Sequence, residues 1–136
     1  MNRRTDVKNN NIDALKYISS TAGELKKQFI PQIYTLNEFA PVRQLNFKDI
    51  ILTLYRLNLS DEKILEFVGK NKVFAVTMPF EQAISTSLAN SLKEKDVFVY
   101  AHTINSPNVL EKLQKKGVSG IYTDFLVLNY AAKKKN

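Results

Sequence analysis

Residues 96–125 read DVFVYAHTINSPNVLEKLQKKGVSGIYTDF and carry the strongest structural signals of the chain. An apolar, β-rich run opens the segment. Ser106 and Pro107 follow it as a helix N-cap residue and a proline at the first helical position, where the missing N–H costs nothing. Gly117 stands where a helix C-cap glycine belongs, and a second β-rich run comes after it. A strand, a helix and a strand within roughly thirty residues predict a βαβ unit, whose two strands are parallel.

The same alternation of strand and helix signals recurs along the rest of the chain. Predicted strands begin at intervals of roughly 20 to 24 residues, the spacing of consecutive β/α units. They are Thr5–Lys8, Phe29–Tyr34, Asp49–Tyr55, Val73–Pro79, Val97–Thr103 and Ser119–Asp124. This pattern predicts an α/β fold with an all-parallel sheet, either doubly wound or part of a (β/α)8 barrel. No G-x-G-x-x-G turn follows any of the strands, which argues against a dinucleotide-binding sheet.

Composition bounds the domain organisation. The hydrophobic content of 44% and the charged content of 24% are ordinary for a folded domain. We expect one domain over residues 1–130 and a disordered basic tail over residues 131–136.

No apolar run approaches the roughly 20 residues that span a bilayer, so no transmembrane segment is expected. The absence of cysteine excludes disulfides and thiolate metal sites, and it is consistent with a reducing, cytoplasmic compartment.

The net charge of +7 is distributed mainly over the ends of the predicted helices and the tail. Lysine in the last turn of a helix is favoured by the helix dipole. A nucleic-acid surface would need basic residues clustered with exposed aromatics on one face. Here the aromatic residues Phe74, Phe98 and Tyr100 sit in strand runs and are predicted to be core. The charge is compatible with a phosphate-bearing small molecule as ligand, and no nucleic acid is expected.

The C-terminal pattern resembles the glycerophosphodiester phosphodiesterase family. The sequence VFVYAHTIN…GVSGIYTDF is similar to the family's last two strands, whose pattern is roughly hydrophobic-W-T-V-N and then G-V-D-G-I-x-T-D-x-P. Upstream, Asp6-Val7-Lys8 is similar to the acidic-x-Lys motif of the family's third strand. The predicted strands between these two regions resemble the fourth to sixth. The resemblance implies a partial TIM barrel of the phospholipase-C-like phosphodiesterase type, running from the third strand to the eighth.

The activity that this resemblance implies is the metal-dependent hydrolysis of glycerophosphodiesters to glycerol 3-phosphate and an alcohol, a reaction of lipid metabolism. The family's first strand ends in a His-Arg pair, and its second carries Glu-x-Asp followed by another histidine. This sequence has no counterpart of either strand, and it contains a single histidine, His102. The chain therefore resembles a truncated hydrolase. We predict that it has no catalytic residues of its own and is inactive alone.

Two residues near the N-terminus are the candidates for binding metal and phosphate. Asp6 matches a family position that carries a metal-binding carboxylate, usually the longer glutamate; a solvated surface aspartate is the alternative. Lys8 lies two residues further on the same face of the predicted strand, where the resemblance implies contact with the phosphate. A solvated lysine is the alternative there. The implied cofactor is a divalent metal, Mg or Ca, at a site that this sequence leaves incomplete.

Further candidates lie at the carboxyl ends of the predicted strands, where barrel enzymes place their sites. His102 stands in place of the family's strand-seven tryptophan and is predicted to form a pocket wall or a ligand hydrogen bond, or else to be a packed aromatic substitute. Gln32 is predicted to bind substrate. The candidates for the pocket rim are Tyr34, Thr53, Tyr55, Thr77 and Met78. Asn105 and Asp124 match the family's T-x-N and T-D positions, and turn hydrogen bonds explain them without a ligand.

Three interpretations follow from these observations. In the first, the chain is the C-terminal part of a metal-dependent phosphodiesterase. Its missing strands then lie in a partner, an upstream segment or a removed part, and a second copy can pair with the open edge strands. In the second, the chain is a non-catalytic remnant of that family that binds a phosphate ligand or a protein. In the third, it is an unrelated open α/β ligand-binding domain.

Overall fold

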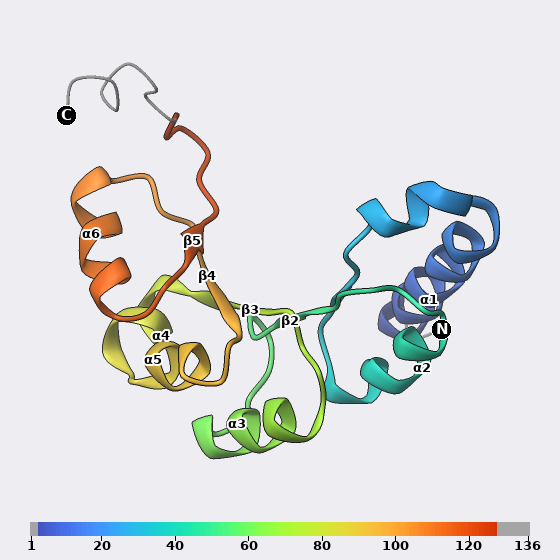
Figure 1. The fold of residues 1–136 in the computed structure, drawn as a ribbon, viewed down its shortest axis with the longest axis horizontal. Helices are drawn as coiled ribbons and strands as arrows, with labels where there is room; N and C mark the ends of the chain where they lie inside the picture. The colour runs from blue at the N-terminus through green and yellow to red at the C-terminus, as the bar shows by residue number, and fades with distance from the viewer. Residues whose placement is uncertain (1–2, 128–136) are drawn as a thin grey trace. The chain divides into compact units, whose positions relative to one another are not determined.

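The computed structural model of the chain describes residues 3–127, and of residues 3–10 it describes the backbone alone (Figure 1). The predicted basic tail over residues 131–136 lies outside the described residues. The chain forms two compact units, the first ending at Thr77 and the second beginning at Met78.

Five strands form the sheet in the order β1-β2-β3-β4-β5. Their bounds are β1 (Gln32–Ile33), β2 (Ile51–Thr53), β3 (Ala75–Pro79), β4 (Phe98–His102) and β5 (Gly120–Ile121). β1 pairs with β2, β2 with β3 and β4 with β5, each in parallel orientation. Helices alternate with the strands along the chain. The predicted parallel α/β fold is therefore confirmed, with strands at five of the six expected places.

The strand predicted over Thr5–Lys8 is wrong, because these residues belong to α1 (Arg3–Thr21). A parallel strand is buried on both faces and needs a nearly continuous apolar run. Thr-Asp-Val-Lys contains one apolar residue, Val7. The helical spacing of Ile12, Leu15 and Ile18 extends instead through the preceding polar residues.

The first unit contains two short 3₁₀ helices and two further α-helices besides α1. Their bounds are η1 (Gly23–Gln28), η2 (Leu36–Glu38), α2 (Phe39–Gln44) and α3 (Asp61–Lys70). Glu38 accepts the backbone N–H of Thr35 at 3.2 Å, as its place in a capping box predicts. Ser60 caps α3, because its hydroxyl oxygen accepts the N–H of Lys63 at 3.4 Å. α1 packs on α2, and the two helices lie side by side in Figure 1.

The second unit holds α4 (Phe80–Ser85), α5 (Leu88–Lys93) and α6 (Pro107–Lys115) together with β4 and β5. α4 and α5 both pack against β4. Pro107 opens α6 as predicted, and Gly117 ends it with a positive φ of 94°. A Cβ on Gly117 would lie 2.6 Å from Asn90 Oδ1, so the position also requires glycine because of close packing.

The two faces of β4 differ in burial. Val99 and Ala101 are fully buried, whereas Tyr100 and His102 are half-buried and Phe98 is 49% exposed. Side chains alternate between the two faces of a strand, so the three ring-bearing residues share the more open face. The prediction that Phe98 belongs to the core is wrong. The reason is that strand composition does not tell which of the two faces is covered.

None of the helices described within residues 3–127 is both long enough and apolar enough to cross a membrane.

Candidate functional site

The first unit brings two hydroxyl groups together, one from the last residue of β2 and one from the middle of β3. Thr53 and Thr77 are register partners in the parallel sheet. The Thr77 hydroxyl donates a hydrogen bond to Thr53 Oγ1 at 3.1 Å, and both residues are buried. The two hydroxyls thus satisfy each other in a place where an unpaired polar group would be costly.

Exposed aromatic and basic side chains follow β1 and β2 along the chain. Tyr34 follows β1 with 42% of its surface exposed, and Tyr55 lies two residues beyond β2 with 59% exposed. The guanidinium carbon of Arg56 lies 5.5 Å from the centre of the Tyr55 ring, a cation–π geometry. Gln32, in β1, is exposed. This end of the first unit therefore offers phenol and guanidinium groups to a ligand, whereas Gln32 lies level with Ile51 at the start of β2.

One residue predicted for the pocket rim is buried, and one exposed basic residue was not predicted. Met78, predicted for the pocket rim, is fully buried and belongs to the core. Arg56 was not singled out from the sequence, although it is the first basic residue after the predicted strand Asp49–Tyr55. A cation directly after a strand is the signal that identifies it, because strand carboxyl ends carry the sites of barrel enzymes.

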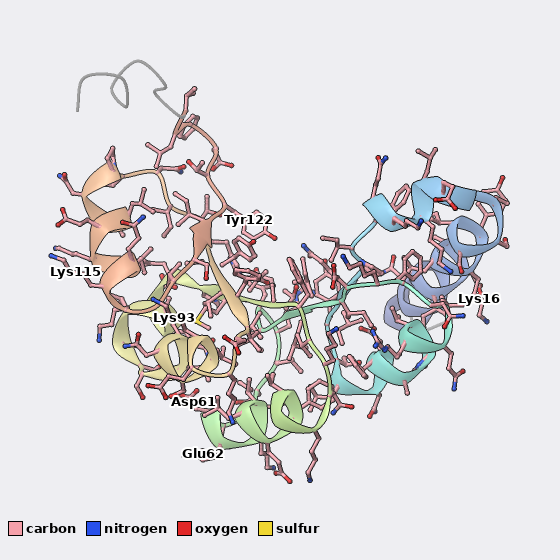
Figure 2. The ribbon with its side chains drawn as sticks, in the orientation of Figure 1. Lys16, Asp61, Glu62, Lys93, Lys115 and Tyr122 are labelled. Carbon is pink, nitrogen blue, oxygen red and sulfur yellow. The ribbon has the colours of Figure 1, made fainter. Side chains whose placement is uncertain are left out.

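In the second unit, His102 ends β4 and shares a strand face with Tyr100. His102 is half-buried, and its Nε2 atom is shielded from solvent. The ring centres of Tyr100 and Tyr122 lie 6.1 Å apart with an interplanar angle of 61°. Tyr122, which is labelled in Figure 2, is 41% exposed. The pattern of the sequence did not mark this pair, because it arises from pairing between β4 and β5.

Asn105 and Asp124 are joined by hydrogen bonds across 19 residues of sequence, and not by the local turn bonds that were expected. Asn105 Oδ1 accepts the backbone N–H of Asp124 at 3.0 Å and the Thr123 hydroxyl at 3.0 Å. The amide nitrogen of Asn105 lies 3.4 Å from a carboxylate oxygen of Asp124. This network joins the segment after β4 to the segment after β5.

Asp6 and Lys8 lie in α1 and not in a strand. In a helix, residues two apart do not face each other, so the shared strand face on which they were placed is absent. Their roles as metal ligand and phosphate contact remain predictions. Among the residues whose side chains are described, no three His, Cys, Asp or Glu residues gather as a set of metal ligands. That part of the chain does not by itself form the donor set that the family resemblance implies.

The predicted substrate-binding residues fall in different units, Gln32 in the first and His102 in the second. His102 ends β4, as predicted from the sequence, whereas Gln32 is the first residue of β1 and not at its carboxyl end. Their contact with a substrate remains a prediction.

Comparison with known proteins shows a likeness of fold. No protein-family model matches the sequence, and no significant match is found among curated proteins. Among solved structures, the chain is similar to a glycerophosphodiester phosphodiesterase from Thermotoga maritima, with a TM-score of 0.62 and 18% sequence identity. The match covers 79% of this chain and 50% of that one, so this chain spans about half the length of the structure that it matches. At this identity the likeness establishes the fold, a parallel α/β sheet that corresponds to part of a TIM barrel.

Proposed function

We propose that the chain forms the C-terminal part of a glycerophosphodiester phosphodiesterase barrel and binds the phosphodiester at the carboxyl ends of its strands. The main support is the likeness of fold to the Thermotoga enzyme. The Thr103-x-Asn105 and Thr123-Asp124 patterns, which follow β4 and β5, add to it. Strand carboxyl ends are where barrel enzymes hold their substrates.

In this proposal Gln32 and His102 contact the substrate, Lys8 contacts its phosphate, and Asp6 binds a divalent metal, Mg or Ca. Gln32 is exposed. An amide side chain can donate hydrogen bonds to phosphate oxygens and accept them from glycerol hydroxyls. The remaining metal ligands and the acid–base groups come from a partner segment or a second chain. Arg56 is an additional candidate for binding the phosphate, because guanidinium groups match phosphate geometry.

The chain alone is expected to be inactive. Breaking a phosphodiester bond needs positioned groups that transfer protons to and from the reacting oxygens. One histidine in the sequence cannot serve as both the acid and the base of a two-histidine mechanism.

The activity test uses the purified chain with glycerophosphocholine and Mg or Ca, with EDTA as control. We expect no release of glycerol 3-phosphate from a sample whose circular dichroism shows folded protein. Turnover that EDTA abolishes would overturn the incomplete-site part of the proposal. It would mean that residues of this chain, within one copy or across a dimer, supply acid and base.

Binding is tested separately by titrating glycerol 3-phosphate into ¹⁵N-labelled chain. We expect saturable amide shifts at strand carboxyl ends, for example at Tyr34 and Tyr55, and none near Lys72, which precedes β3. Gln32→Ala should weaken binding, whereas Gln114→Ala, at an exposed glutamine of α6, should not. Absence of saturable shifts, or equal effects of the two substitutions, would refute the proposed binding end.

A second candidate function is a non-catalytic phosphate-ligand or protein-binding remnant of the family. The single histidine favours it. The two candidates differ in their dependence on metal. For the enzyme part, where a second copy completes the metal site, Mg should strengthen glycerol 3-phosphate binding, and Asp6→Asn should remove that effect while Asp13→Asn, elsewhere on α1, retains it. For the remnant, binding should be the same in Mg and in EDTA.

A further inference from the structure

α1 and α2 border an open hollow in the first unit. The two helices pack on each other, and the hollow between them has a volume of about 560 Å³. Ligand pockets in proteins commonly measure about 300–1,000 Å³, so this one has room for a small molecule. Six residues line it; they are Ile12, Asp13 and Lys16 from α1, and Pro41, Gln44 and Leu45 from α2 and its C-cap.

Hydrogen bonds hold the walls of the hollow together. The carbonyl oxygen of Leu45 accepts the Ser19 hydroxyl of α1 at 2.8 Å, and it also accepts the ammonium group of Lys26 in η1. Pro41 fixes one φ angle of α2. Because α1 is tied in this way to the end of α2, the hollow exists without a ligand, as small-molecule sites usually do.

Two opposite charges line the hollow from α1. Asp13 and Lys16 are three residues apart in the helix, a spacing that brings Cβ atoms to about 5–6 Å from each other. Both residues are exposed, and Lys16 is labelled in Figure 2. The ion pairs found within residues 11–127, where side chains are described, join other residues. The carboxylate and the ammonium group are therefore both available to a ligand.

This lining suits a zwitterion better than a phosphate. A phosphate group is held by basic side chains and backbone N–H groups. Here the one lysine of the hollow stands beside a carboxylate, which repels an anion. The ammonium and carboxylate groups of an α-amino acid are attached to the same carbon atom, so such a ligand can meet two opposite charges that lie one helical turn apart. The apolar residues of the lining are Ile12, Pro41 and Leu45.

We infer that the hollow between α1 and α2 binds a free α-amino acid with an aliphatic side chain, such as leucine. Asp13 binds its ammonium group, and Lys16 binds its carboxylate. The aliphatic side chain packs on Ile12, Pro41 and Leu45. None of the six lining residues is assigned to the phosphodiester, so this inference goes beyond the proposed function and does not rest on it.

The first test compares leucine with two compounds that each lack one of its charges. Isocaproate lacks the ammonium group, and isoamylamine lacks the carboxylate. Each is titrated into the ¹⁵N-labelled full chain. We expect leucine to shift the amides of Lys16 and Gln44 saturably, with a dissociation constant of about 1 mM, the scale for a ligand of this size in an open site.

Isocaproate and isoamylamine should each bind about threefold more weakly than leucine, because each loses one exposed charge contact. Equal binding of the three compounds would overturn the inference. So would the absence of saturable shifts at about 10 mM leucine, tenfold above the expected dissociation constant.

The second test combines these ligands with substitutions. Asp13→Asn should weaken leucine binding about threefold and leave isocaproate binding unchanged, because isocaproate has no ammonium group. Lys16→Met should weaken leucine binding likewise and leave isoamylamine binding unchanged. Glu62→Gln and Lys63→Met, at exposed positions of α3, are the matched controls. The amide spectrum of each variant shows whether it is folded. Unchanged leucine binding in folded Asp13→Asn or Lys16→Met would refute the site.

Parallel titration with glycerol 3-phosphate separates this inference from the proposed function. Glycerol 3-phosphate binding without leucine binding would remove the amino-acid site and leave the proposed function standing. Leucine binding without glycerol 3-phosphate binding would support the amino-acid site and contradict the proposed phosphodiester site. Absence of both would contradict both proposals.

Discussion

The side-chain oxygen of Asn105 accepts the backbone N–H of Asp124 at 3.0 Å, across 19 residues of sequence. The same oxygen accepts the Thr123 hydroxyl. One amide group thus holds the segment that follows β5 against the segment that follows β4. The asparagine and aspartate that the family resemblance marks therefore have a structural role in this chain, whatever ligand they meet.

Asn105→Ala should destabilise the chain by about 1 kcal/mol, because exposed hydrogen bonds contribute on this order. Urea denaturation followed by circular dichroism measures the change. Asn108→Ala is the control, since Asn108 is an exposed asparagine of α6. Hydrogen exchange at the Asp124 amide should also accelerate in Asn105→Ala alone. Equal stability of the two variants would contradict the assigned role of Asn105.

The buried hydroxyl pair at β2 and β3 predicts non-additive mutations. Thr53→Val or Thr77→Val alone leaves the other hydroxyl without its partner, and we expect each to destabilise the chain by about 1–3 kcal/mol. The double variant should lose less than the sum, because it leaves neither hydroxyl unpaired. Thermal denaturation of the two single variants and the double variant completes the cycle. Additive losses would show that the two hydroxyls do not depend on each other.

Gly120→Ala should destabilise the chain by about 1–3 kcal/mol, because the added methyl group must displace the Tyr100 ring. Gly69→Ala provides the contrast. Gly69 lies in α3 with no atom within 4 Å of a Cβ built on it. Alanine there should stabilise the chain by up to about 1 kcal/mol through helix propensity. Denaturation midpoints distinguish the two variants, and a stabilising Gly120→Ala would show that the ring is not held against this glycine.

The ion pair between Glu66 and Lys70 predicts a pH effect. Lys70 Nζ donates to a Glu66 carboxylate oxygen at 2.6 Å, and this hydrogen bond, together with the positive charge of Lys70, lowers the pKa of Glu66. A lowered folded-state pKa stabilises the folded chain above the unfolded-state pKa, and the contribution is lost as pH falls through the folded-state value. Both side chains are exposed, so the effect on stability is small.

Lys70→Met should therefore raise the pKa of Glu66 toward its ordinary value. Carboxyl ¹³C chemical shifts recorded against pH measure it. Lys72→Met is the control, because Lys72 does not contribute to the lowered pKa of Glu66. The same Glu66 pKa in both variants would rule out Lys70 as the main cause.

Sequence patterns predicted the fold where the signals act over a few residues. Pro107 and Gly117 lie at the ends of α6 where they were expected, because helix-end signals act within the adjacent turn. The prediction of a strand over Thr5–Lys8 was wrong for the opposite reason. It was one of the six strands expected from the alternating pattern, but the polar residues around it belong to the helix that contains Ile12 and Leu15.

The candidate site was harder to predict from the sequence than the fold. The strand end that carries His102 follows from the order of strands and helices, so its placement could be expected, whereas Gln32 begins its strand. The exposure of Phe98 and the burial of Met78 could not be predicted, because burial depends on which elements cover each face of a strand.

The sequence by itself determined the alternation of strands and helices, their caps and the parallel α/β class, since these follow from local spacing and from the connections between strands. The tertiary structure alone decided which distant side chains meet. Tyr100 lies against Gly120, and Asn105 holds Asp124, because β4 and β5 pair in one particular register. That register depends on packing between segments about twenty residues apart, which no local pattern encodes.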